Sequence, residues 1–193
     1  MNSIKRFLVS ALLLTLVASV AAAETKIVTV SIVRLFEGYY KTTERMAQFE
    51  SLNEQAMAEA ENRQRRFEEQ VANFQEMQED LENPMLSDSA REANEAEVQR
   101  KFEEVRQVQF ENQQWEQQTT QQLNQRMMEI QQELLGEIRD VVDVIAREEG
   151  ARVILDSSDI GGRGIPTVIW ADPRLDITDI VLRELNRNAP SSD

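Results

Sequence analysis

Two long stretches of the chain carry apolar residues on one narrow face, which is the pattern of paired helices. Successive residues of an α-helix are rotated by about 100°, and on that spacing the apolar residues of each stretch fall into a single stripe. We call the two facing stripes the arm seam; its main candidates are Phe49, Phe67, Phe74, Leu81, Phe102, Leu123, Ile130 and Leu134. Because the second stripe keeps a period near 3.6 residues, we expect nearly straight helices packed antiparallel.

A proline separates the two stretches. The helix-breaking residues between positions 36 and 149 are few: Gly38, Pro84 and Gly136. A proline inside a helix removes a donor and clashes with the preceding turn. The sequence therefore predicts a helical hairpin arm over residues 36–149, with its turn at 83–88. At about 1.5 Å per residue each helix would reach roughly 70–90 Å, farther than a compact domain of this length requires.

The segments that flank the arm predict a small base, so the expected fold class is α+β. Runs rich in β-branched residues indicate three short strands, at 26–33, 151–156 and 167–170. Asp176 as N-cap, with Asp179 three residues later, resembles a capping box and predicts a short helix. The base is therefore discontinuous, formed by residues 24–35 and 150–185, and a polar tail follows at 186–193.

This base is too small to fold well by itself. A unit of roughly fifty residues buries too little apolar surface, and without disulfides or metal the usual solution is oligomerisation. We therefore expect copies of the chain to associate through the strands. The candidates for this contact are Ile27, Val28, Val30, Ile32, Val153, Ile154, Leu155, Val168, Ile169 and Trp170.

The seam weakens halfway along the arm. Between Gln109 and Gln122 polar residues occupy the seam positions. A turn centred on Met85 would place this stretch opposite residues 48–61, where the seam offers Phe49 and otherwise small alanines. Because local stability follows buried apolar contacts, we expect a flexible zone there.

The N-terminus has the features of a secretory signal peptide. A charged start with Lys5 and Arg6 precedes an apolar run, and small residues close the segment at Ala23. We expect cleavage after residue 23 and export of the mature chain. The alternative, a retained membrane anchor, is disfavoured because the apolar run is short for a span. Loss of Lys5 and Arg6 would change the net charge from −14 to −16.

Composition argues against nucleic acid as a partner and against enzyme chemistry. A strongly negative charge repels nucleic acid and anionic head groups. The chain has no Cys and no His, which removes thiolate chemistry and the commonest general base and metal ligand. The glycine-rich run at 161–164 lacks the Lys-Ser/Thr ending of a P-loop, and the aspartates near it lack EF-hand spacing. We expect no cofactor, no metal and no catalytic residue.

A few apolar residues lie off the seam. Phe110 and Met128 point away from the partner helix, while Trp115, Met46 and Met57 fall at the edge of the seam. Edge residues can pack against the partner helix, and isolated exposed apolar residues are common. Soft Met and aromatic side chains on a mobile surface also suit non-specific binding of apolar segments. We take these five residues as candidates for contacts with a bound chain.

The chain resembles the Skp/OmpH family of periplasmic chaperones. The resemblance covers residues 26–36, the hairpin and the strand at 153–156, and is most specific at 170–182, which reads Trp-Ala-Asp-Pro-Arg-Leu-Asp-Ile-Thr-Asp-Ile-Val-Leu. It implies a homotrimer with a small central β-body. Three arms would enclose a cavity that holds unfolded outer-membrane proteins without ATP.

Two features depart from the family. The arm tip, residues 76–97, carries eight acidic residues and one basic residue, Arg91. Family members often have basic tips, so this tip argues against binding of lipopolysaccharide or anionic lipid. The glycine-containing loop at 159–166 also looks longer than is typical of the family.

The favoured function is therefore an ATP-independent holdase for unfolded outer-membrane proteins. Its acidic charge could also select clients with basic segments, which would make binding sensitive to salt. The alternative is a structural adaptor or spacer of an envelope assembly, whose hairpin docks onto a partner's helices. That alternative predicts apolar and Arg anchors at the tip and more strands beside the hairpin than this chain offers.

Overall fold

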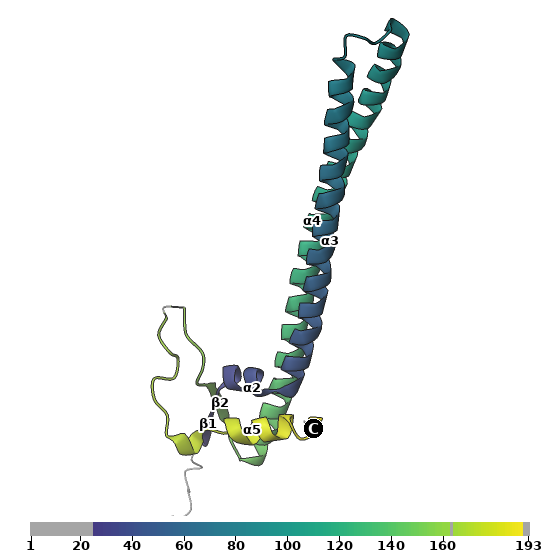
Figure 1. Cartoon of the computed structure of the whole chain (residues 1–193). Coiled ribbons are helices and arrows are strands. Elements are labelled where there is room, and N and C mark those ends of the chain that lie inside the picture. Colours follow the sequence, from purple (N-terminus) through teal and green to yellow (C-terminus); the bar gives the residue numbers. More distant parts are fainter. Residues whose placement is uncertain (1–24, 163, 191–193) are drawn as a thin grey trace, which may run out of the picture.

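A computed structural model describes residues 25–162 and 164–190 and shows a long antiparallel helical hairpin on a small base (Figure 1). The arm consists of α3 (Tyr40–Leu81) and α4 (Asp88–Glu148). The base contains β1 (Ile27–Val30), α2 (Ile32–Gly38), β2 (Val153–Asp156), the 3₁₀ helix η1 (Pro173–Leu175) and α5 (Thr178–Leu185). The predicted α+β class and the helical hairpin are confirmed. The predicted signal peptide lies outside the described residues. Within the described residues, no helix is long and apolar enough to cross a membrane.

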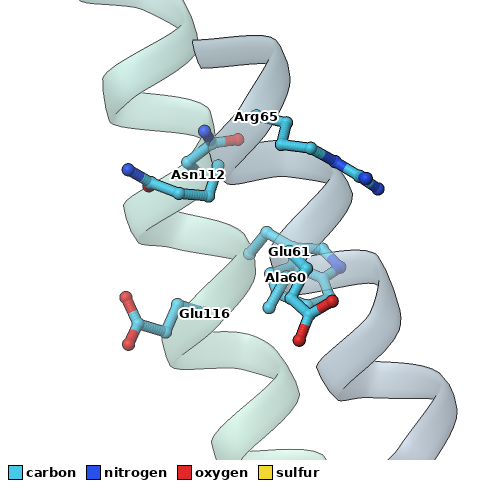
Figure 2. Close-up of a pocket in the computed structure, with 7 residues that line it drawn as sticks. Ala60, Glu61, Arg65, Asn112 and Glu116 are labelled. Carbon is cyan, nitrogen blue, oxygen red and sulfur yellow. The ribbon is translucent and has the colours of Figure 1, made fainter. Parts of the chain in front are cut away.

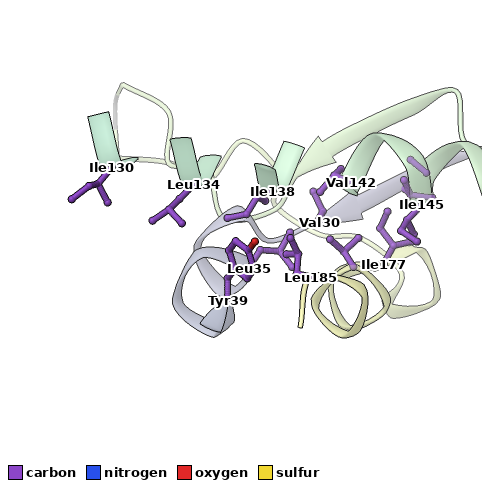
Figure 3. Close-up of a cluster of buried hydrophobic side chains, with 13 residues drawn as sticks. Val30, Leu35, Tyr39, Ile130, Leu134, Ile138, Val142, Ile145, Ile177 and Leu185 are labelled. Carbon is purple, nitrogen blue, oxygen red and sulfur yellow. The ribbon is translucent and has the colours of Figure 1, made fainter. Parts of the chain in front are cut away.

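The base brings the two ends of the chain together. β1 and β2 pair in parallel, from Ile27 with Val153 to Val30 with Asp156, and the whole arm forms the connection between them. Residues from β1, α2, the lower part of α4 and the C-terminal segment share one hydrophobic core (Figure 3). Its most deeply buried side chains are Val28, Val30, Leu35, Ile130, Leu134, Ile138 and Val181. This core fixes the direction in which the arm leaves the base.

The predicted third strand at 167–170 is wrong. Within the described residues the sheet has two strands, and the segment bends at Thr167 and Ile169 on the surface. Ile169 is 86% and Trp170 80% exposed. The segment's residues favour a strand, but among the described residues its backbone pairing is limited to the bond from the Thr167 N–H to the Asp159 carbonyl, which is too little for a ladder. The composition of the segment favours a strand, but a strand also requires a neighbouring strand to pair with.

The predicted first strand is also too long. β1 ends at Val30, and Ser31 then caps α2 by accepting a hydrogen bond from the Arg34 backbone N–H (3.2 Å). Serine at this position satisfies a free N–H of the first helical turn, which favours a helix over the β-branched preference of Ile32 and Val33. Ile32 therefore belongs to a helix, and Phe36 belongs to α2 rather than to the arm.

The predicted N-cap of the last helix, Asp176, is wrong by one residue. α5 begins at Thr178, with Ile177 as the N-cap residue. The Asp176 carboxylate instead accepts bonds from the backbone N–H (2.8 Å) and hydroxyl of Thr178. The Thr178 hydroxyl accepts in turn from the Ser31 N–H (2.9 Å). This local turn competes with the N-cap geometry and links the C-terminal segment to the start of α2.

The two arm helices are offset from the expected register. The Arg63 guanidinium lies 4.9 Å from the Trp115 ring centre, and Arg45 pairs with Glu133 at 2.8 Å. The polar stretch at 109–122 therefore faces a part of α3 about two helical turns closer to the tip than residues 48–61. Part of the offset arises at the tip, where Arg91 of α4 donates to the Leu81 carbonyl that ends α3 (2.8 Å).

Candidate binding surface

The five off-seam candidates do not form one site. Phe110 and Met128 lie on α4 and are each 55% exposed, and Met57 on α3 is 59% exposed. Met46 and Trp115 are half-buried between the helices. The structure therefore separates freely accessible apolar residues from residues that fill the space between the arms.

Trp115 borders a groove between the arm helices (Figure 2). The groove has a volume of about 580 Å³ and is lined by Ala60, Glu61, Gln64, Arg65, Asn112, Trp115 and Glu116. It opens where the small Ala60 side chain faces the second helix. The Arg63 guanidinium covers the Trp115 ring at cation–π distance and also pairs with Glu59 at 2.8 Å. Trp115 is thus held in place rather than free. Most of the residues that line the groove are polar or charged, but most of the surface they present to it is apolar.

The seam residues differ in how deeply they are buried. Ile130 and Leu134 are buried at the lower end of the arm, and the Phe74 and Phe102 rings meet at 5.8 Å nearer the tip. Phe102 itself is 41% exposed. The remaining candidates are half-buried: Phe49, Phe67, Leu81 and Leu123. On α4 no residue between Val98 and Ile130 is fully buried, so contacts between the helices are weakest in that stretch.

We predict that the middle of the arm opens more readily than either end. Backbone amides at 109–122 and in the facing part of α3 should exchange faster than those at 130–145, because fewer apolar contacts must break for local opening. Hydrogen exchange followed by mass spectrometry on the full chain would measure this. Uniform protection along both helices would contradict it.

The candidate residues for contact between copies fall into two groups. Val28 and Val30 are 1% exposed and fill the chain's own core, and Ile154, Val168 and Ile32 are half-buried. The others leave apolar surface uncovered: Ile27 40%, Val153 39%, Leu155 39%, Ile169 86% and Trp170 80% exposed. The second group therefore provides the apolar surface that the predicted contact between copies would cover.

The glycine-containing loop is a structured turn. The Gly161 N–H donates to the Ile165 carbonyl (3.0 Å), and Thr167 donates from its N–H to the Asp159 carbonyl (3.0 Å). Gly164 has a φ of 72°, which other residues adopt with strain. Arg163, which belongs to the glycine-rich run at 161–164, lies outside the described residues. Among the described residues no cluster of three or more carboxylates could hold a metal ion.

Sequence reasoning missed the residues that hold the arm on the base. Asn186, assigned to the polar tail, accepts the Tyr40 N–H (3.0 Å) and donates to the Gly38 carbonyl (2.8 Å). Its amide thus bridges the end of α2 and the start of α3. The available signal was an Asn directly after an amphipathic helix, but only the fold shows that the joint of the arm lies beside it.

A second group at the arm base joins α3 to α4. Glu137 accepts hydrogen bonds from the Tyr39 hydroxyl and from Lys41 (2.8 Å). Burial acts to raise the pKa of Glu137, but these bonds outweigh it and hold the pKa below its ordinary value. Burial, with help from Glu137, raises the pKa of Tyr39. The lowered pKa of Glu137 and the raised pKa of Tyr39 favour an ionised Glu137 and a neutral Tyr39 at neutral pH, which are the forms that this contact requires.

A long helical hairpin that projects from a small base with a two-stranded parallel sheet defines the structural class of this chain. The family model "Outer membrane protein (OmpH-like)" matches residues 26–185, so the chain belongs to the OmpH-like family. A solved structure from Caulobacter crescentus, described as that of a candidate outer membrane chaperone (OmpH-like), has a TM-score of 0.57 at 16% identity and covers 89% of each chain. That similarity shows the fold. No curated protein matches the sequence.

Proposed function

We propose that this protein is an ATP-independent holdase chaperone that shields unfolded outer-membrane proteins in the periplasm. The observation that carries the proposal is the arm, a reaching structure with exposed apolar side chains, mounted on a base of the OmpH-like family. Its fold neighbour is described as a candidate outer membrane chaperone. Such binding requires no catalytic residue and no cofactor.

The working unit we propose is a homotrimer. The exposed apolar residues of β1, β2 and the segment at 167–170 would be covered by neighbouring copies, and the strand-forming segment would find the partner that it lacks within one chain. Three arms around this body would enclose a cavity for the client. The negative charge of the arms would keep loaded assemblies apart.

The mature chain would begin after cleavage of residues 1–23. Residues 24–35 and 150–185, together with the rest of α2, would form the body, residues 40–149 the arm and residues 186–193 the tail. Because Arg91 already donates to the carbonyls of Leu81 and Asn83, the one basic side chain of the tip is engaged in the turn. This supports the expectation that anionic lipid and lipopolysaccharide are not bound there.

Two measurements on the mature chain test this function. An outer-membrane β-barrel protein diluted from urea should stay in solution when the chaperone is present, as followed by light scattering. The mass of the chaperone in solution should be that of three chains. Unsuppressed aggregation or a monomer mass would overturn the proposal, and binding to a folded helical partner instead would favour the adaptor alternative.

We predict that replacing both Phe110 and Met128 with Ser weakens client binding. Both side chains are more than half exposed, so the change should leave the fold intact while removing apolar contact area. The affinity for the unfolded barrel, measured by fluorescence titration, should fall about tenfold, the equivalent of roughly 1.4 kcal/mol. Replacing Val144, which is also more than half exposed on α4 but is not a contact candidate, with Ser serves as a control. Equal affinity of the Phe110 and Met128 double variant and wild type would contradict the prediction.

A further inference from the structure

The two arm helices present outward faces of different character. The outward face of α3 is charged through the middle of the arm, with exposed Glu50, Glu54, Glu61, Arg65 and Glu68 recurring at helical spacing. The corresponding face of α4 carries no charged residue from position 107 to 135. We call it the uncharged face; its exposed residues are Phe110, Gln114, Gln117, Gln121, Asn124, Met128, Gln131 and Leu135.

This asymmetry is notable in a chain with a net charge of −14. The charged residues of α4 in the same stretch lie on its other sides: Glu111, Glu116, Arg126, Glu129 and Glu133. Several are engaged there, since Arg126 pairs with Glu129 at 3.3 Å and Glu133 pairs with Arg45 at 2.8 Å. The uncharged face therefore runs for roughly 38 Å along the arm, at about 1.5 Å per residue, without an ion.

The uncharged face looks toward the base. Continued down α4 at helical spacing, this direction passes the exposed Arg139, where the uncharged face has ended, and reaches Val142 and Ala146. These two residues are 4% and 2% exposed because they belong to the hydrophobic core of the base. The base thus stands on the side of the arm to which this face points. Figure 1 shows the loop between β2 and η1 rising on that side, in the direction of the arm; Ile160 and Ile165 on this loop are exposed.

We propose that the uncharged face of α4 is the surface that binds the client, and that its occupant is an extended, uncharged segment of an unfolded chain. The inference rests on the proposed holdase function. An extended segment brings unpaired backbone N–H and C=O groups, and Gln and Asn side chains both donate and accept hydrogen bonds. Phe110, Met128 and Leu135, at 55%, 55% and 38% exposure, supply apolar contacts between these amides.

The chemistry of this face selects the class of segment. A charged client group lying on it would lose water and find amide hydrogen bonds but no opposite charge, whereas an uncharged segment needs no such charge. Membrane strands of outer-membrane barrels alternate apolar and polar residues and have few charges on the lipid side, so they fit this description. Binding through this face should change little with salt, because it contains no ion to screen.

The test introduces charge on the uncharged face and, as a control, beside it. In the full mature chain, the double variant Gln117→Glu and Gln121→Glu adds two charges to the face. The control, Gln118→Glu and Gln122→Glu, adds the same charges one position along, on the flank that carries Glu111 and Glu129; all four positions are exposed. With an unfolded outer-membrane barrel as the probe, the first variant should bind about tenfold more weakly and the control within twofold of wild type.

A photo-crosslinking residue at position 121 or 122 locates the client directly. Crosslinks to the barrel from 121 that greatly exceed those from 122 would support the inference. Equal crosslinking, equal affinities of the two double variants, or crosslinks from 121 to a second copy of the chain would overturn it while leaving the holdase function standing. A wild-type chain that binds no barrel would overturn the proposed function, and this inference with it.

Discussion

Replacing Ile138 with Ala should destabilise the base more than any surface change in the molecule. Ile138 is 0% exposed and lies in the core that β1, α2, α4 and α5 share (Figure 3). Removing its outer carbons leaves a cavity in a core that cannot collapse freely, a change that typically costs about 2–5 kcal/mol. Thermal unfolding should occur roughly 6–12 °C lower, for a mid-range loss of about 3 kcal/mol in a chain of this length.

The matched control lies two turns farther along the same helix. Val144 is 54% exposed, and replacing it with Ala removes similar side-chain bulk without opening a cavity. Circular dichroism melting of both variants measures the difference. An Ile138→Ala variant that melts together with Val144→Ala would show that the base does not depend on this core.

The arm could be predicted from the sequence because its signals are local. A stripe at helical spacing and a single central proline are sufficient for two helices and a turn, and the helices end at Leu81 and begin again at Asp88, on either side of Pro84. The base depends on contacts between distant positions. The Ser31 hydroxyl caps α2, and its backbone N–H donates to the hydroxyl of Thr178, 147 residues away. No local pattern reports such a contact.

The segment at 167–170 shows a second limit. Its β-branched residues favour a strand, yet pairing depends on a neighbour, and Ile169 and Trp170 remain exposed in the single chain. The register of the arm shows a third limit. A symmetric turn is the simplest assumption, but Trp115 meets Arg63 and Glu133 meets Arg45, a register that the turn residues alone do not indicate.

The candidate binding residues could be predicted in part. Phe110 and Met128 stand out as off-seam apolar positions, and the absence of charge around them is visible once the sequence is wound on a helix. The sequence does not show whether Phe110 and Met128 lie on the side of the arm where the base stands. This follows only from the burial of Val142 and Ala146 lower on the same side of α4.

Replacing Asn186 with Ala should loosen the joint between arm and base. The side chain bridges the Gly38 carbonyl and the Tyr40 N–H, where the backbone turns between α2 and α3. Gly38 leaves room for Leu182 of α5, since a Cβ at Gly38 would lie 3.0 Å from the Leu182 side chain. The joint between α2 and α3 is therefore formed where α5 packs closely against Gly38. Asn186 supplies the hydrogen bonds that hold this joint. Losing both bonds at a half-buried position should cost about 1–3 kcal/mol.

Two readouts separate a loosened joint from general destabilisation. The Tyr40 amide should exchange faster in Asn186→Ala while amides at 130–145 keep their protection, since the core itself is untouched. Small-angle scattering should show a broader range of arm orientations. Asn188→Ala, an exposed change two residues along, should resemble wild type in both. If the Tyr40 amide exchanges alike in all three proteins, Asn186 does not hold the arm, and the direction of the uncharged face must be set by the buried core alone.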